Sequence, residues 1–168
     1  DRMLVPVSIN VSRLHAYDEK LAETLIRLRE EYDVPPEYVP LELTESAFLE
    51  DEAGMYRRME SLRERGFLVS MDDFGTGYSS LNHIREIPID VIKVDQSFVK
   101  DLAGDAYSQS FIKMVAELAQ TIGVSVCVEG IETPEQFKVL QGMKVKYIQG
   151  YYFDRPMERH AFEAKYVK

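Results

Sequence analysis

Short apolar runs alternate with longer amphipathic stretches along the whole chain. Between the runs, apolar residues recur at the helical spacing of three and four, as at Leu21, Leu25 and Leu28. This order predicts parallel strands joined by helices that cross over in the right-handed sense. The strand-like runs occupy residues 5–10, 38–42, 67–72, 91–94, 124–128 and 144–149.

Local signals predict where the helices begin and end. Asp18 is expected to cap the first long helix, and Gly66 to close the second. Thr133, Pro134 and Gln136 stand in the order of an N-cap, a first-turn proline and a capping-box partner. A short helix is expected around Leu81 and Ile84, and core-facing helix positions at Met55, Met59, Leu62, Phe111, Met114, Val115, Leu118 and Ile122.

Polar residues stand at the carboxyl ends of the strand-like runs. In a (β/α) barrel these ends converge on one mouth, where catalytic residues collect. The alternative is an open doubly wound sheet, but the turn after Asp72 and Asp73 is not GxGxxG and no suitably placed acidic residue follows it. We therefore predict an α/β fold of the TIM-like barrel type. The strand-end residues are Asn10, Glu42, Asp72, Lys93, Glu129 and Gln149.

Strand alternation predicts which side chains point into the barrel. Residues two apart share a face, so Ser70 is expected to lie inward with Asp72, and Cys127 with Glu129. The branched apolar residues of the same runs are expected to face the helices. An inert core thiol is the simplest interpretation of Cys127, because no histidine stands near it in sequence.

Composition narrows the classes of function. The chain has 168 residues, one domain's worth, and a net charge of −9, which argues against non-specific DNA binding. No apolar run is long enough to span a bilayer, so no membrane contact is expected of this segment. The single cysteine fits a reducing cytoplasm, and the expected location is the cytoplasm or the cytoplasmic part of a larger membrane-bound protein.

The strand-end residues form an all-oxygen ligand set of the kind that Mg²⁺ or Mn²⁺ prefers over zinc. Several carboxylates that share a bridging aspartate are what a two-metal phosphodiester site requires. Taken singly, Glu42 or Glu129 is better explained as a solvated loop acid, and Lys93 equally well as a salt-bridge partner. His15, His83 and His160 lack metal-ligand spacing and are expected at the surface.

Six motifs, in order, closely resemble the EAL-domain family of bacterial phosphodiesterases, which hydrolyse cyclic di-GMP to linear pGpG. They lie at residues 8–12 (SINVS), 41–46 (LELTES), 72–80 (DDFGTGYSS), 92–95 (IKVD), 128–133 (VEGIET) and 149–153 (QGYYF). The resemblance implies a TIM-like barrel with two Mg²⁺ or Mn²⁺ ions at its mouth.

The resemblance also implies roles for individual residues. Lys93 would position the hydrolytic water, with Gln149 assisting and Asp95 close by. Glu45 would anchor the loop after the Asp pair, and Glu132 would fix its own turn. The metal ligands would be Asn10 and Glu42 for the first ion, Asp72 as the bridge, and Asp73 and Glu129 for the second.

One family feature is missing. No Glu-Ala-Leu occurs in the chain, although its glutamate is a further ligand of the first metal in the family. We therefore expect residues 1–168 to be the C-terminal two-thirds to three-quarters of an EAL-type domain that lacks its first one or two strand-helix units, with one ligand supplied by the missing segment. The resemblance implies cyclic di-GMP, a homodimer, and attached sensor or cyclase domains as partners. The alternative functions are a cyclic di-GMP receptor without hydrolysis and an interaction scaffold.

Overall fold

The computed structural model describes residues 5–16, 18, 20–48, 52–77 and 84–167. In this part of the chain one parallel sheet has the order β1-β2-β3-β4-β5-β6, so strands that follow each other in sequence also pair in space. A doubly wound sheet would reverse direction part-way, and this one does not. The strands are β1 (Ile9–Asn10), β2 (Leu41–Thr44), β3 (Val69–Phe74), β4 (Val91–Val94), β5 (Ser125–Val128) and β6 (Tyr147–Ile148).

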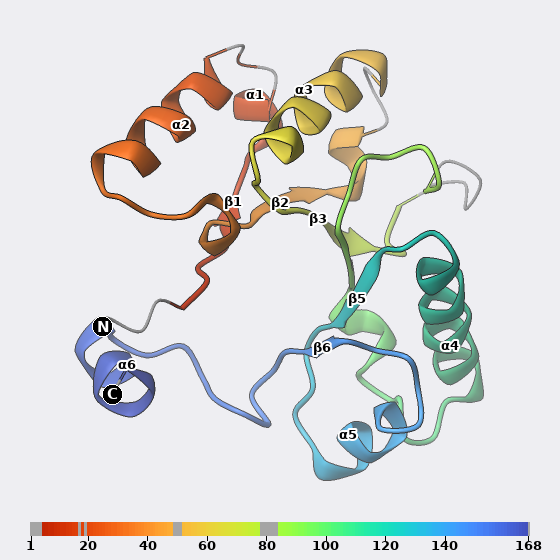
Figure 1. The fold of residues 1–168 in the computed structure, drawn as a ribbon. Helices are drawn as coiled ribbons and strands as arrows, with labels where there is room; N and C mark the ends of the chain where they lie inside the picture. The colour runs from red at the N-terminus through yellow and green to blue at the C-terminus, as the bar shows by residue number, and fades with distance from the viewer. Residues whose placement is uncertain (1–4, 17, 19, 49–51, 78–83, 168) are drawn as a thin grey trace.

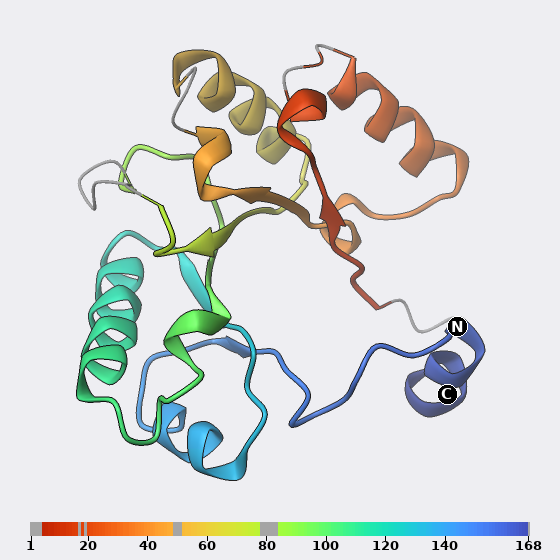
Figure 2. The same ribbon diagram turned by 180° about the vertical axis from the view of Figure 1, so that it is seen from behind.

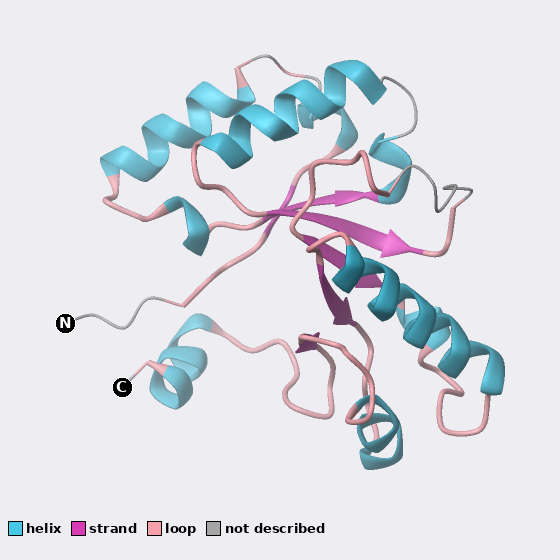
Figure 3. Cartoon of the chain, turned by 45° about the vertical axis from the view of Figure 1, so that its right-hand side comes forward, coloured by secondary structure: helices cyan, strands magenta, loops and turns pink. Residues whose placement is uncertain are grey.

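Helices α2 to α5 lie outside the curve of the sheet, as in a barrel, whereas α6 lies beside its open side (Figure 1). Seen from behind, β1 and β6 are the two edge strands and do not pair with each other, and the segment after β6 leads to α6 on that side (Figure 2). The strands fan out in Figure 3, and every neighbouring pair is parallel, so all six run in the same direction. The predicted TIM-like barrel is therefore confirmed as a partial barrel. The α-helices are α1 (Arg13–Ala16), α2 (Leu21–Glu31), α3 (Glu52–Glu64), α4 (Ala106–Thr121), α5 (Pro134–Leu140) and α6 (Arg159–Tyr166), and the 3₁₀ turns are η1 (Pro36–Tyr38), η2 (Glu45–Phe48) and η3 (Gln96–Phe98).

The core fills the space between the sheet and its helices. Leu41 and Leu43 of β2 point outward to this layer and are fully buried, as are Met55 and Met59 of α3. Burying one such side chain stabilises the fold by about 1.5–3 kcal/mol. The predicted methionine stripe is thus confirmed. On α4 the prediction is wrong for Met114, which is 43% exposed, because Ile112, Val115, Ala116 and Ala119 face the sheet instead.

The element boundaries follow the backbone hydrogen-bonding capacity of each segment. The expected strand over residues 38–42 starts only at Leu41, since Pro40 has no N–H to donate. Pairing is also shorter than expected at both edges, where β1 and β6 have two residues each. The helix expected around Leu81 lies largely outside the described residues, and Ile84 sits in a turn.

Two of the three capping predictions are confirmed, and the third is wrong. The box at α5 is confirmed: Thr133 accepts a hydrogen bond from Gln136 N–H, and Gln136 Oε1 accepts one from Thr133 N–H. Gly66 follows α3 with a φ of +89°, as its closing role requires. Asp18 is not the N-cap of α2, because the chain makes one more turn and Asp18 Oδ1 accepts from the backbone N–H of Lys20.

A charged pair ties α3 to the sheet. Arg63 forks onto both carboxylate oxygens of Asp90, with Nη2–Oδ1 at 2.9 Å and Nε–Oδ2 at 3.2 Å. The same carboxylate accepts the backbone N–H of Val69 at 2.8 Å, at the start of β3. The pair therefore fixes both the helix and the first residue of the strand that ends in the two aspartates.

Replacing Asp90 with Ala is expected to lower the free energy of unfolding by about 1–3 kcal/mol, because the half-buried Arg63 and Val69 N–H both lose their acceptor. Urea unfolding followed by circular dichroism measures this. The control is Glu31→Gln, which removes an exposed partner 3.7 Å from Arg27 and should change stability by less than about 0.5 kcal/mol. An Asp90→Ala protein as stable as the control would contradict the assignment.

Candidate functional site

One buried lysine sits among three carboxylates at the carboxyl edge of the sheet. Lys93 Nζ lies 2.7 Å from Glu129 Oε1, 2.8 Å from Glu42 Oε2 and 3.1 Å from Asp72 Oδ1. The lysine is 6% exposed, and the carboxylate side chains are 12% to 17% exposed. We call these four residues the lysine cluster.

The parallel register brings these side chains together from four strands. Glu42 is in β2, Asp72 in β3 and Lys93 in β4, while Glu129 follows β5 directly. Asn10 of β1 pairs with Glu42, which places the first predicted ligand at the same edge. Because every strand ends at this edge, residues up to 87 positions apart (42 and 129) become neighbours.

The inner face of the sheet encloses a cavity of about 400 Å³. Its wall includes Ser70 and Cys127, the inward residues expected from strand alternation, and Glu42 and Lys93 lie in the same wall. Burial raises the pKa of the Cys127 thiol to about 12, and the nearby Glu129 carboxylate acts in the same direction. Cys127 is therefore a protonated, buried thiol and not a nucleophile.

The charges of the lysine cluster do not balance. Burial acts to lower the pKa of Lys93, but hydrogen bonds to Glu129 and Glu42 outweigh it and raise that pKa above its usual value. Burial raises the pKa of Glu129, against the opposing effect of Lys93. Three carboxylates face one ammonium, so negative charge is in excess.

Asp73 departs from strand alternation. Its φ is +55°, and the β3–β4 register shifts between Met71 and Phe74. Such a bulge re-aims a side chain, and here Asp73 joins Asp95 and Glu129 in the wall of a second pocket. Burial raises the pKa of Asp73, and the negative charges of Asp72 and Asp95 raise it further.

The second pocket, of about 330 Å³, adjoins the lysine cluster through Glu129. We call it the acidic pocket. Gln149, the predicted assisting residue, and Glu132 also line it. Asp95 caps η3 by accepting Ser97 N–H at 2.9 Å, which fixes its carboxylate at the pocket wall. Sequence reasoning missed Gln96 and Pro156, which carry no charge that would have marked them. The wall also includes three residues of the quoted motifs to which no individual role was assigned, Gly130, Gly150 and Tyr151.

The loop after the two aspartates is held by Glu45. This carboxylate is 3% exposed and accepts the N–H groups of Gly75 at 3.0 Å and Gly77 at 3.3 Å. A side chain at Gly75 would meet Phe98 at 2.6 Å, so the close approach requires glycine. Residues 78–80 of the same motif lie outside the described residues.

The turn after β5 is fixed by a residue to which no site role was assigned. Buried Gln136 accepts the N–H groups of Glu132 and Thr133, and its Nε2 donates to Val99 O at 3.0 Å. It thereby joins the loops that follow β4 and β5. Glu132 contributes only its backbone to this turn; its exposed side chain lines the acidic pocket instead. The capping-box pattern of Thr133 and Gln136 was the sequence signal that could have identified Gln136.

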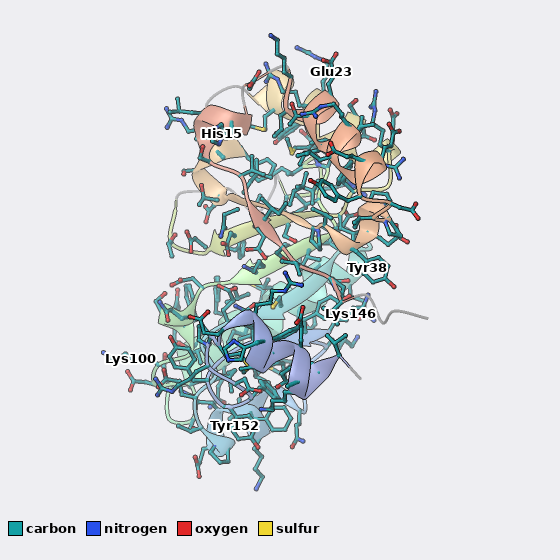
Figure 4. The ribbon with its side chains drawn as sticks, turned by 90° about the vertical axis from the view of Figure 1, so that its left-hand side faces the viewer. His15, Glu23, Tyr38, Lys100, Lys146 and Tyr152 are labelled. Atoms are coloured by element: carbon teal, nitrogen blue, oxygen red, sulfur yellow. The ribbon has the colours of Figure 1, made fainter. Side chains whose placement is uncertain are left out.

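Most of the predicted site residues lie together, and Asn10 lies apart, exposed on the edge strand β1. The residues in the lysine cluster or the acidic pocket are Glu42, Asp72, Asp73, Lys93, Asp95, Glu129, Glu132 and Gln149. His15 and His160 are exposed, as expected, and His83 is outside the described residues. Figure 4 views the open side of the sheet, with His15 at the α1 end and Tyr152 at the opposite end.

The donor set suits hard divalent cations. The oxygens of Glu42, Asp72, Asp73 and Glu129 are the ligand type of Mg²⁺ and Mn²⁺, and their surplus negative charge calls for further positive charge. Within the described residues, however, no three acidic, histidine or cysteine side chains are already grouped as a metal cage. The residues fit the metals in kind, while their carboxylates are organised around Lys93.

Comparison with known proteins agrees with this chemistry. The EAL domain family model matches residues 2–156. The cyclic di-GMP phosphodiesterase PA2567 of Pseudomonas aeruginosa is 40% identical over 151 residues, covering 90% of this chain but only 26% of that protein. The chain thus spans about a quarter of the length of this curated relative.

Two solved structures share the fold. The PaMucR phosphodiesterase in complex with c-di-GMP superposes with a TM-score of 0.87 at 29% identity, over 94% of this chain and 64% of that one. Klebsiella pneumoniae BlrP1 with manganese and cy-diGMP gives 0.84 at 28% identity, over 90% and 39%. With the family model covering nearly the whole sequence and the strand ends arranged as described, this chain belongs to the EAL domain family.

Proposed function

We propose that this chain carries the catalytic centre of a metal-dependent phosphodiesterase that hydrolyses cyclic di-GMP to linear pGpG in bacterial signalling. The observation that carries the proposal is the lysine cluster, in which Lys93 meets carboxylates from three other strand ends. The name of the relative PA2567 and the nucleotide complexes of PaMucR and BlrP1 support the substrate. No helix among the described residues is long and apolar enough to cross a membrane.

The proposed metal ligands are the oxygen donors at the strand ends. Bound Mg²⁺ or Mn²⁺ would polarise the phosphodiester and activate a water molecule as the nucleophile. The manganese complex of BlrP1 supports this class of ion. A further ligand from a segment preceding this chain is part of the proposal. The five ligands from this chain are Asn10, Glu42, Asp72, Asp73 and Glu129.

The other residues act on water and substrate. Lys93 donates a hydrogen bond to the attacking water and offsets the negative charge that develops on the phosphoryl oxygens. Gln149, in the wall of the acidic pocket, orients the substrate with its amide, and Asp95 lies beside it. Glu45 keeps the loop after Asp73 in place through Gly75 and Gly77, so that both aspartates hold their positions.

The proposal also covers the wider protein. Residues 1–168 would form the C-terminal two-thirds to three-quarters of the catalytic domain, which is supported by its 64% coverage of the PaMucR chain. Sensor or cyclase domains and a second copy of the chain are the proposed regulatory partners. The relative DosP, named as an oxygen sensor and 32% identical over 151 residues, supports attached sensor domains.

In the full-length protein with Mn²⁺, Asp72→Asn and Lys93→Met are each expected to lower kcat for cyclic di-GMP hydrolysis by at least about 100-fold, because each removes charge at the reacting centre. Chromatographic detection of pGpG measures this. Asp101→Asn, in an exposed turn, is the matched control and should retain activity. EDTA should abolish turnover and weaken nucleotide binding, since the acidic site has little other positive charge. A folded, metal-loaded protein without turnover would contradict the proposed function.

Asp73→Asn is expected to raise the urea midpoint of the metal-free protein at pH 8 while abolishing hydrolysis. Burial and the repulsion by Asp72 and Asp95 raise the pKa of Asp73, so stability is lost as pH rises through that pKa, and asparagine removes the loss. Asparagine also tolerates the positive φ. The gain should vanish near pH 3, where the carboxyl is protonated in both states. A lower midpoint than wild type at pH 8 would contradict this account.

A cyclic di-GMP receptor without hydrolysis is the second candidate. One observation favours it: the described carboxylates are not pre-assembled as a metal cage. Calorimetry that shows nucleotide binding in EDTA, with no pGpG formed in Mn²⁺, would select this candidate over the enzyme.

A further inference from the structure

We propose that Lys93 is the internal counter-ion of the metal-free site, and that divalent cations bind by displacing its ammonium group from the three carboxylates. This inference rests on the proposed metal dependence. It adds that Lys93 competes with the metal ion for the same carboxylates. The lysine is then more than a partner of the attacking water: it occupies the place where positive charge is needed until the metal supplies that charge.

Lys93 has three carboxylate partners. Its Nζ lies 2.7 to 3.1 Å from one oxygen each of Glu42, Asp72 and Glu129, and it donates a hydrogen bond to Glu42 Oε2 at 2.8 Å. A lysine ammonium has three donors and no acceptor, so these three ion pairs match its donor count. The side chain is 7% exposed, which leaves little room for water to take part. Each of these three acids is also a proposed metal ligand.

An ammonium and a divalent cation repel each other strongly at such separations. Like charges a few ångströms apart repel strongly where the effective dielectric constant is well below that of water, and a divalent ion doubles the repulsion of a monovalent one. Full occupation of the same carboxylates by both cations is therefore unfavourable. The hydrogen bonds to Lys93 must weaken or break as the metal binds.

The acidic pocket offers the incoming ion an entry point outside the lysine cluster. Asp73 and Asp95 line this pocket, and no ion pair with Lys93 is described for either of them, whereas Glu129 belongs to both the pocket and the cluster. A cation attracted by Asp73 and Asp95 meets Glu129 next and competes with the lysine for it. The structure thus supplies a path for the exchange as well as its end point.

Displacement has a functional consequence. In the metal-free protein the ammonium is held among three carboxylates and is directed at them instead of at a phosphate or a water. Once released from the carboxylates, it can donate to either. Metal binding would therefore switch on the lysine, which ties substrate recognition to metal loading.

The decisive measurement is Mn²⁺ binding to the protein without nucleotide, by calorimetry at pH 8, where protons compete little for the carboxylates. Lys93→Met removes the competing charge and is expected to tighten the dissociation constant at least about tenfold, with a larger Mn²⁺-induced rise in Tm than in wild type. Lys146→Met is the control, because Lys146 is an exposed lysine on the surface (Figure 4) and its loss changes net charge equally.

An unchanged or weakened Mn²⁺ affinity in Lys93→Met would overturn the proposal, since it would make the lysine a spectator or a scaffold for the ligands. Absence of Mn²⁺ binding in both proteins would overturn it as well. Because no nucleotide is present, these outcomes are independent of whether the full-length protein hydrolyses cyclic di-GMP.

A second measurement uses the wild-type protein and does not depend on the folding of a variant. Acetylation of lysines by acetic anhydride, read by peptide mass spectrometry, should be slow at Lys93 without metal and rise at least about threefold relative to Lys146 with Mn²⁺, as the ammonium leaves its ion pairs. Lys93 labelling that stays the same or falls on adding Mn²⁺ would contradict displacement.

Discussion

A buried ammonium shared by three carboxylates is the constraint on which the rest of this structure depends. Taking such charges out of water costs several kcal/mol per ion, and the cost is recovered only if nearly every donor finds an acceptor. Lys93 has a carboxylate oxygen within 3.1 Å from each of β2, β3 and the end of β5. The order and register of the strands are constrained by this cluster. If one strand slipped by a single residue, its charged side chain would point into the apolar layer between the sheet and the helices.

The two adjacent aspartates show how the backbone serves this arrangement. On a regular strand, Asp72 and Asp73 would face opposite sides of the sheet. The positive φ of Asp73 and the bulge after Met71 break the alternation and bring both carboxylates to the mouth. Backbone strain of this kind persists only where the surroundings enforce it. Here Glu45 holds the next turn through two N–H groups, and Phe98 packs against Gly75.

The sequence predicted those features that depend on local pattern. The strand ends, the Met55–Met59 stripe and the α5 capping box each follow from neighbours within four positions, and the family resemblance came from motifs of similar length. Met114 was misplaced because the rotation of α4 about its axis depends on what the sheet offers, and the apolar pattern alone admits two faces. The ion pair between Lys93 and Glu42 depends on the order of the strands, and so does the link that Gln136 makes between the loops after β4 and β5. Neither contact could be predicted from the local sequence around these residues.

Stability and activity make opposite demands on the same atoms. A site that must hold divalent cations needs more carboxylates than one lysine can neutralise, and here three carboxylates lie within 3.1 Å of the Lys93 ammonium. Burial raises the pKa of Glu129 and of Asp73, and neighbouring carboxylates raise both further. Without Lys93, the surplus would be larger and the strand ends would repel each other before any metal arrived. With several cationic side chains in the cluster, every carboxylate would already be ion-paired and none would be left to bind a metal. One lysine among several acids lets the fold form first and still leaves the carboxylates under-compensated, which is the condition a metal site requires.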